Sequence, residues 1–227
     1  GPARALGALA ASAAAAFGLL GGRRSFLRRS ARCPTPRWRT ARPAAGAAGN
    51  PRPKAVVFDL DGCIWHPDMY ELWGGGAPFK LQPDGRLKDR RGRPVALHSG
   101  VRTALNELAD DAAWRGVTVA VASCCDEPGW ARECLSKFEL GVAGRKLKDV
   151  LTVQHVYKAN KQRHLRSIAN AASCGLEEMI FFDNEPYNCY DVAEIGVTCI
   201  YCPGGVTERV WREGVAAFPR AGQVVKL

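Results

Sequence analysis

The sequence predicts an α/β protein, built as a three-layered, doubly wound parallel sheet with a small hairpin flap. Three observations support this prediction. Short apolar runs recur from residue 54 onward, stretches with helical spacing of apolar residues separate them, and residues 79–97 interrupt the alternation with a turn signal. Strands that alternate with helices favour a parallel sheet covered by helices on both faces.

Five apolar runs are expected to be strands. They are mostly apolar, without the regular polar alternation of a half-exposed strand, which is typical of strands buried on both faces. The runs are residues 55–60, 117–123, 150–153, 179–183 and 197–201. We expect them to form a five-stranded parallel core.

Two stretches between these runs are expected to be amphipathic helices. In residues 101–112 apolar side chains recur every three or four positions, and Ser99 is the expected N-cap. Residues 165–172 repeat the pattern, and Gly175 is expected to cap the C-terminal end of that helix. No internal repeat is evident in the sequence.

Residues 79–97 lie between the first strand and the first long helix. They contain Pro83-Asp84-Gly85 between two short extended runs, which indicates a hairpin. The insert is too small to be a domain, so we expect it to form only a flap beside the sheet.

The charge of the chain is unevenly distributed. The formal net charge is +10, from 32 Lys/Arg and 22 Asp/Glu. Eleven of the basic residues lie in residues 1–58, which hold no acidic residue, so the remainder carries 21 basic against 22 acidic side chains. A nucleic-acid-binding face on the folded domain is therefore not expected.

Residues 1–53 are expected to be a transit- or signal-like disordered segment, and residues 54–227 the folded domain. The segment is rich in Ala and Arg and free of acids, as organellar transit peptides are. We expect import into an organelle, with the plastid favoured over the mitochondrion; a secretory signal or a disordered tail on a cytoplasmic protein is the alternative. Its apolar run, residues 8–20, is shorter than the about 20 residues that a membrane span needs.

Two acidic residues follow the first expected strand, in the sequence Asp59-Leu60-Asp61-Gly62. In an open α/β sheet, ligands bind at the carboxyl ends of the strands. Phosphoryl transfer needs a nucleophile, a cation and a proton donor, and two carboxylates at such an edge can supply the first and the last. Taken alone the motif is weak, because Asp and Gly are also common turn residues.

Three other positions add to this motif. Ser123 ends the second expected strand and offers a hydroxyl for a phosphoryl oxygen. Lys161 follows Asn160 at a helix start, where a cation and free backbone N–H groups bind an anion together. The fourth strand ends in Asp183-Asn184-Glu185, whose oxygens suit a hard cation such as Mg²⁺.

The four motifs in this order resemble those of the haloacid dehalogenase (HAD) superfamily. Within it, the chain is similar to the eukaryotic magnesium-dependent phosphatases with a minimal cap, over about residues 54–205. The segments that carry the resemblance are VFDLDGCIW (57–65), PDGRLKDRRG (83–92), MIFFDNE (179–185) and GVTCI (196–200), together with Ser123 and Lys161.

The resemblance implies a HAD-like, Rossmann-like fold with strand order 5-4-1-2-3. It implies that Asp59 is the nucleophile and a Mg²⁺ ligand, and that Asp61 is the general acid/base and binds the metal through its backbone carbonyl. The phosphate-binding residues that it implies are Leu60, Ser123, Cys124 and Lys161. Lys158 is a competitor for the lysine role, but its spacing to the last motif fits the family less well.

Two positions depart from the family pattern. The family has two acidic residues where this chain has Asp183 and Asn184, so the metal ligand there is Asp183, Asn184 or Glu185. An amide in place of a carboxylate removes one charge and weakens Mg²⁺ binding. Cys124 stands where the family tends to carry an arginine that contacts the substrate, and a thiol cannot replace a guanidinium.

The expected function is Mg²⁺-dependent hydrolysis of a phosphomonoester through an aspartyl-phosphate, by a monomer without a nucleic-acid partner. The expected substrate is a phosphoprotein or a small phosphorylated sugar or glycated amine. One alternative is a related HAD enzyme that transfers a glyceryl-type group to a carrier thiol. Another is a degenerate, non-catalytic HAD fold that serves as a binding module.

Overall fold

The computed structural model describes residues 51–141 and 144–227, which form a six-stranded parallel sheet at their centre. In spatial order the strands are β10 (Val224–Lys226), β9 (Thr198–Tyr201), β8 (Met179–Asp183), β1 (Ala55–Phe58), β6 (Thr118–Ser123) and β7 (Val153–Val156). Every neighbouring pair is parallel. The α/β fold and the strand order 5-4-1-2-3 are confirmed, and β10 is an additional edge strand beyond β9.

One strand was predicted in the wrong place. Residues 150–153 are not a strand: Leu147–Val150 forms the short helix α3, and β7 begins only at Val153. The Asp149 carboxylate accepts a hydrogen bond of 2.7 Å from the backbone N–H of Lys146 and so stabilises the first turn of α3. Val150 is buried, as a strand residue would be, but it is buried as part of a helix.

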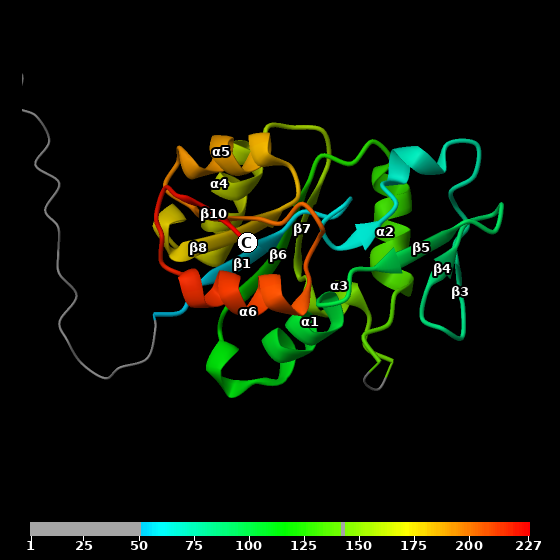
Figure 1. Cartoon of the computed structure of the whole chain (residues 1–227), viewed down its shortest axis with the longest axis horizontal. Coiled ribbons are helices and arrows are strands. Elements are labelled where there is room, and N and C mark those ends of the chain that lie inside the picture. Colours follow the sequence, from blue (N-terminus) through cyan, green and yellow to red (C-terminus); the bar gives the residue numbers. More distant parts are fainter. Residues whose placement is uncertain (1–50, 142–143) are drawn as a thin grey trace, which may run out of the picture. The chain divides into compact units, whose positions relative to one another are not determined.

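Helices cover both faces of the sheet (Figure 1). The longer ones are α1 (Val101–Asp110), α2 (Pro128–Lys137), α4 (Lys161–Ala172), α5 (Pro186–Ala193) and α6 (Glu208–Ala217). Short 3₁₀ turns are η1 (Met69–Leu72), η2 (Ala112–Trp114) and η3 (Leu176–Glu178). In Figure 1, α4 and α5 lie on one face, and α1 and α6 on the other, which gives the three layers expected.

The side chains of β1 point alternately into two cores. Val56 and Phe58 pack with apolar residues of α1 and α6, whereas Ala55 and Val57 pack with those of α4 and α5. All four are completely buried. This double burial explains why the run is apolar at every position.

Both expected helix caps were wrong. The N-cap position of α1 is Gly100, not Ser99, and a Cβ atom there would lie 2.2 Å from the backbone carbon of Thr207. The close approach of two backbones therefore requires glycine at this position. Helix α4 ends at Ala172, and its C-cap is Ser173, not Gly175; Ser173 takes the left-handed conformation with φ of 51°.

The predicted flap is confirmed as a small antiparallel sheet, and no large cap is evident in the described residues. Its strands are β2 (Trp65–His66), β5 (Pro94–Leu97), β4 (Leu87–Lys88) and β3 (Lys80–Leu81), in spatial order. The Pro83-Asp84-Gly85 turn joins β3 to β4: the Gly85 N–H donates to the Gln82 carbonyl, and Gly85 has φ of +78°. A second turn joins β4 to β5 around Asp89, whose buried carboxylate accepts hydrogen bonds from Arg93 and Gly76.

The described part of the chain contains no helix that is both long and apolar enough to cross a membrane. The targeting prediction concerns residues 1–53, of which residues 1–50 lie outside the described residues.

Candidate active site

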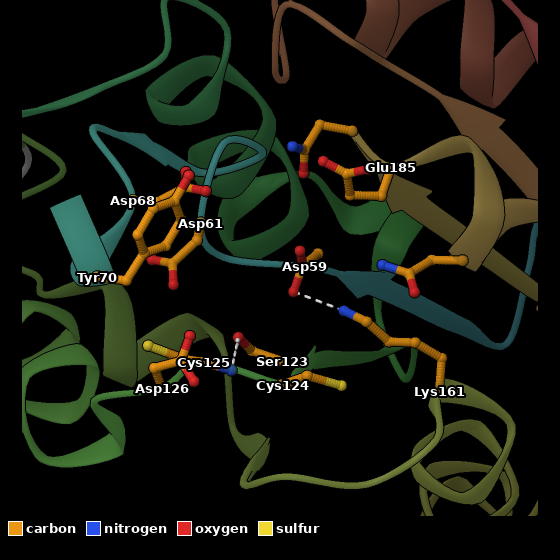
Figure 2. Close-up of a pocket in the computed structure, with 12 residues that line it drawn as sticks. Asp59, Asp61, Asp68, Tyr70, Ser123, Cys124, Cys125, Asp126, Lys161 and Glu185 are labelled. Atoms are coloured by element: carbon orange, nitrogen blue, oxygen red, sulfur yellow. Dashed lines mark hydrogen bonds and ion pairs between the residues drawn. The ribbon is translucent and has the colours of Figure 1, made fainter.

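A pocket of about 200 Å³ opens at the carboxyl ends of β1, β6 and β8 (Figure 2). Its lining is formed by Asp59, Asp61, Asp68, Tyr70, Ser123, Cys124, Cys125, Asp126, Lys161, Asn184, Glu185 and Asn188. Seven of these were predicted from the sequence as catalytic, phosphate-binding or metal-binding candidates. Two further candidates, Leu60 and Asp183, do not line the pocket.

The inner end of the pocket holds an ion pair between Asp59 and Lys161. Lys161 donates from its Nζ to Asp59 Oδ1 over 2.6 Å and to the Ala122 carbonyl over 2.7 Å (Figure 2). Asp59 directly follows β1, and Lys161 is the first residue of α4, with the Asn160 side chain capping that helix. The end of a strand and the start of a helix thus bring opposite charges together.

Lys161 is 3% exposed, yet it remains charged. Burial alone would lower its pKa, but the carboxylates of Asp59 and Asp183 raise the pKa above its ordinary value. Lys158, the competing lysine, lies in an exposed ion pair with Asp126 and does not line the pocket. The structure therefore pairs Lys161, not Lys158, with Asp59.

Asp183 is completely buried behind the pocket. Its carboxylate accepts hydrogen bonds from the Glu185 N–H and from the Asn188 side-chain amide, and one oxygen lies 3.2 Å from Lys161 Nζ. With these partners its oxygens face Lys161 and the first turn of α5, not the pocket. Its observed position is that of a side chain that orients Lys161.

Asp61 lies in the turn that follows β1. Its Oδ1 accepts a hydrogen bond of 2.8 Å from the indole N–H of Trp65, which fixes the direction of the carboxylate. Burial raises the pKa of Asp61 above its ordinary value. A carboxyl with a raised pKa holds a proton more readily, as a general acid must.

Hydrogen bonds from distant segments hold this turn in place. The Leu60 carbonyl accepts from the N–H of Cys63 and of Ile64, while the Leu60 side chain is completely buried in the core. Val206, in the loop after β9, donates from its N–H to the Cys63 carbonyl over 2.9 Å. His98, next to β5, donates to the Ile64 carbonyl over 3.0 Å.

Asn184 presents a side-chain oxygen without a partner. Its Oδ1 is buried from solvent and accepts no hydrogen bond from the described residues, although buried polar atoms are nearly always satisfied. Nowhere in the described residues are three or more His, Cys, Asp or Glu side chains grouped so that they could hold a metal ion. A cation at this pocket would be held by Asp59, by neutral Asn184 Oδ1 and, as the sequence resemblance implies, by the Asp61 carbonyl, and oxygen donors of this kind suit Mg²⁺.

Gly62 permits this position of Asn184. It has φ of +71°, and a Cβ atom there would lie 2.4 Å from Asn184 Nδ2, closer than real Cβ atoms approach other heavy atoms. The backbone conformation favours glycine, and any side chain at this position would displace the Asn184 amide.

We expect Gly62→Ala to destabilise the protein by about 1–2 kcal/mol and also to reduce the phosphomonoester hydrolysis that the sequence predicts. Gly92→Ala is the matched control, because Gly92 has φ of +82° but a Cβ atom added there would meet no other atom within 4 Å. Urea unfolding should show similar losses for both variants, whereas hydrolysis rates should fall only for Gly62→Ala. Equal rates in the two variants would mean that the position of Asn184 has no catalytic importance.

The second strand end contributes Ser123 and Cys124. Ser123 is buried, and its Oγ accepts a hydrogen bond of 3.3 Å from the Cys125 N–H (Figure 2). The Cys124 thiol lines the pocket and donates to the Ala159 carbonyl over 2.9 Å, so it is directed toward the loop before α4.

Several pocket residues were not predicted from the sequence. They are Asp68, Tyr70, Cys125, Asp126 and Asn188. Asp68 and Tyr70 belong to the loop and 3₁₀ turn after β2, where the sequence shows no periodicity that indicates which side chains face the sheet edge. Asn188 lies in the first turn of α5, and the sequence alone does not show where that helix begins, so its position beside Asp183 could not be predicted.

Comparison with known proteins decides the family. The model of the acid phosphatase family matches residues 51–221. The chain belongs to this family. The sequence is also 31% identical over 175 residues to human magnesium-dependent phosphatase 1, covering 74% of this chain and 89% of the human protein. An HAD-like hydrolase superfamily protein of Schizosaccharomyces pombe is 31% identical over 153 residues, covering 64% of this chain and 83% of the yeast protein.

Among solved structures, the chain resembles the phosphatase domain in the N-terminal part of a Bacteroides fragilis protein, crystallised with Mg. The TM-score is 0.46 at 21% identity, over 76% of this chain and 42% of that one. Membership of the acid phosphatase family makes this protein a phosphatase of the HAD superfamily. The resemblance that the sequence motifs implied is thereby confirmed.

Proposed function

We propose that this phosphatase hydrolyses phosphomonoesters with Mg²⁺, through a phosphoryl group carried on Asp59. The position of Asp59 is the observation that carries the proposal. One of its oxygens is bound by Lys161, and within the described residues no hydrogen-bond donor reaches the other, Oδ2. A carboxylate that is oriented through one oxygen leaves the second available for nucleophilic attack.

Mg²⁺ is supported by the donor set described above and by the name of the human relative, a magnesium-dependent phosphatase. The residues that would hold it are Asp59, Asp61 through its carbonyl, and Asn184 through Oδ1. The cation would offset the negative charge of the phosphoryl group and hold it in line with Asp59.

The reaction proceeds in two displacements at phosphorus. Asp59 attacks, the bond from phosphorus to the ester oxygen breaks, and Asp61 gives its proton to that oxygen. Water then attacks the aspartyl-phosphate, Asp61 takes a proton from the water, and the bond between Asp59 and phosphorus breaks to release inorganic phosphate. Lys161 and Ser123 bind the phosphoryl oxygens throughout, which fixes the geometry of both steps.

The small flap bears on the size of the substrate. Because only short strands and turns flank the pocket, a phosphoryl group on a protein surface can reach Asp59 as well as one on a small molecule. We therefore propose a phosphoprotein or a small phosphorylated sugar or glycated amine as substrate.

Hydrolysis of an aryl phosphate, with and without Mg²⁺, tests the proposal. We expect turnover that requires Mg²⁺ and is lost on chelation. A glyceryl-type transferase would leave the aryl phosphate intact, and so would a degenerate binding module. Phosphoenzyme trapped by rapid acid quenching should carry an acid-stable, base-labile acyl phosphate, and its absence during turnover would exclude the covalent route.

We expect Asn184→Asp to lower the Mg²⁺ concentration that gives half-maximal rate. An added negative charge on a ligand of a divalent ion should strengthen binding by about 1–2 kcal/mol after desolvation, roughly five- to thirtyfold. Asn170→Asp, on the exposed face of α4, is the control for added charge elsewhere. A Mg²⁺ titration without any shift, at equal maximal rates, would place the cation on another residue.

We further propose that residues 1–53 direct the protein to an organelle, the plastid before the mitochondrion, and that the enzyme acts there as a monomer. The acid-free, Ala/Arg-rich composition of that segment supports import. A fluorescent protein fused behind these residues should enter the organelle, and cytoplasmic fluorescence alone would contradict the proposal. Sedimentation of a protein that begins near Asn50 should give the mass of one chain.

A further inference from the structure

The outer part of the catalytic pocket is acidic. Lys161 is the one Lys or Arg among the described lining residues, and it is bound to Asp59. Further out the lining adds Asp68, Asp126 and Glu185. Asp126 is paired with Lys158, but no Lys or Arg of the described residues lies in an ion pair with Asp68 or Glu185. The mouth of the pocket therefore carries negative charge that the protein does not neutralise.

An aromatic face adjoins these carboxylates. Tyr70 lines the pocket with 59% of its surface exposed, and it lies in η1, the 3₁₀ turn for which Asp68 is the N-cap. Figure 2 shows Asp68 and Tyr70 together on the side of the pocket opposite Lys161. Carboxylates beside an aromatic face are the chemistry that binds an organic cation.

The pocket thus has two ends of different charge preference. With the phosphoryl group at Lys161 at the inner end, the leaving alcohol would extend past Asp61 toward Asp68, Tyr70 and Glu185. We propose, building on the hydrolysis proposed above, that the enzyme selects phosphomonoesters whose leaving alcohol carries an ammonium group. Asp68 and Glu185 bind that group through charge, and Tyr70 binds it through its ring face. An alcohol with a carboxylate at the same position is rejected.

Three esters of similar size test this with the full chain and Mg²⁺: aminoethyl phosphate, propyl phosphate and carboxymethyl phosphate. They place a cation, a methyl group or an anion at the same distance from phosphorus. We expect kcat/KM for aminoethyl phosphate to exceed that for propyl phosphate by about tenfold, with carboxymethyl phosphate lower by about tenfold again. A phosphoserine peptide flanked by lysine, compared with one flanked by norleucine, shows whether the cation comes from a small alcohol or from a basic peptide.

Variants separate recognition from the intrinsic reactivity of the esters. Asp68→Asn and Tyr70→Leu should each reduce the ratio of aminoethyl to propyl phosphate by about threefold or more. Asp110→Asn is the control for lost negative charge, because Asp110 ends α1 and is paired with Arg145 outside the pocket. It should leave the ratio unchanged.

Several results would overturn the inference. Propyl phosphate hydrolysed as well as the cationic ester, with equal rates for both peptides, would show that the mouth does not select charge. An aminoethyl-to-propyl ratio that is unchanged in both Asp68→Asn and Tyr70→Leu would show that these side chains do not select the cation. A raised Mg²⁺ requirement in Asp68→Asn would assign that carboxylate to the metal. These results leave hydrolysis itself intact, whereas no Mg²⁺-dependent hydrolysis of any ester would contradict the proposed function and this inference with it.

Discussion

Asp59→Asn should reduce phosphatase turnover by about 10⁴-fold or more while the protein stays folded. In the native protein Lys161 Nζ donates a hydrogen bond of 2.6 Å to Asp59. The amide oxygen of asparagine can accept the same hydrogen bond, so the substitution changes the nucleophile more than the packing. It cannot attack phosphorus to give a stable acyl phosphate, because the carboxylate charge is gone. Steady-state hydrolysis of an aryl phosphate, with circular dichroism to confirm folding, measures both effects.

Two further variants serve as comparisons in this experiment. Asp61→Asn should lose most of its activity but still form some phosphoenzyme from an aryl phosphate, whose leaving group needs no proton. Asp110→Asn removes the same charge from the end of α1 and should retain full activity. Near-normal Mg²⁺-dependent hydrolysis by purified Asp59→Asn would show that another residue is the nucleophile.

Lys161→Met should destabilise the fold by about 3–5 kcal/mol. Lys161 is almost completely buried between two carboxylates, with Nζ 2.6 Å from Asp59 and 3.2 Å from Asp183. Removing the cation leaves both carboxylates without compensation in a place where solvent screens them poorly. Urea unfolding with a common slope for wild type and variant measures the loss of free energy.

Lys158→Met provides the matched control, since this lysine is 66% exposed in its ion pair and should cost about 1 kcal/mol or less. Adding Asp183→Asn to Lys161→Met should recover part of the stability, because it removes one of the two uncompensated charges. A Lys161→Met protein as stable as Lys158→Met would mean that the buried ion pair contributes little to folding.

The parallel sheet was predictable because its strands are buried on both faces. Residues 55–58 and 179–183 are apolar at nearly every position, as strands with two covered faces are. The prediction of a strand at residues 150–153 was wrong because Val150 and Leu151 are also buried, and an apolar pattern does not distinguish a buried helical turn from a buried strand. β10 was missed because three partly exposed residues at a sheet edge give no such signal.

The candidate site was predictable where a residue ends a strand or begins a helix. Asp59, Ser123 and Lys161 meet because parallel strands bring their carboxyl ends to one edge. Asp68 and Tyr70 reach the same pocket from an irregular loop, whose path depends on how the flap packs. Which residue of Asp183 and Asn184 faces the pocket also depended on the turn into α5, which local sequence does not determine.

The hydrogen bond from Val206 to the Cys63 carbonyl has a consequence for synthesis of the protein on the ribosome. The turn that carries Asp59 and Asp61 is made early, but Val206, which holds it, emerges only about 140 residues later. Strand β8, which pairs with β1, is also made long after β1. The chain must therefore close a loop over most of the domain before Asp59 is correctly placed. Nascent chains that end before β9 should therefore have no phosphatase activity, and catalytic competence should arise only after Val206 has emerged.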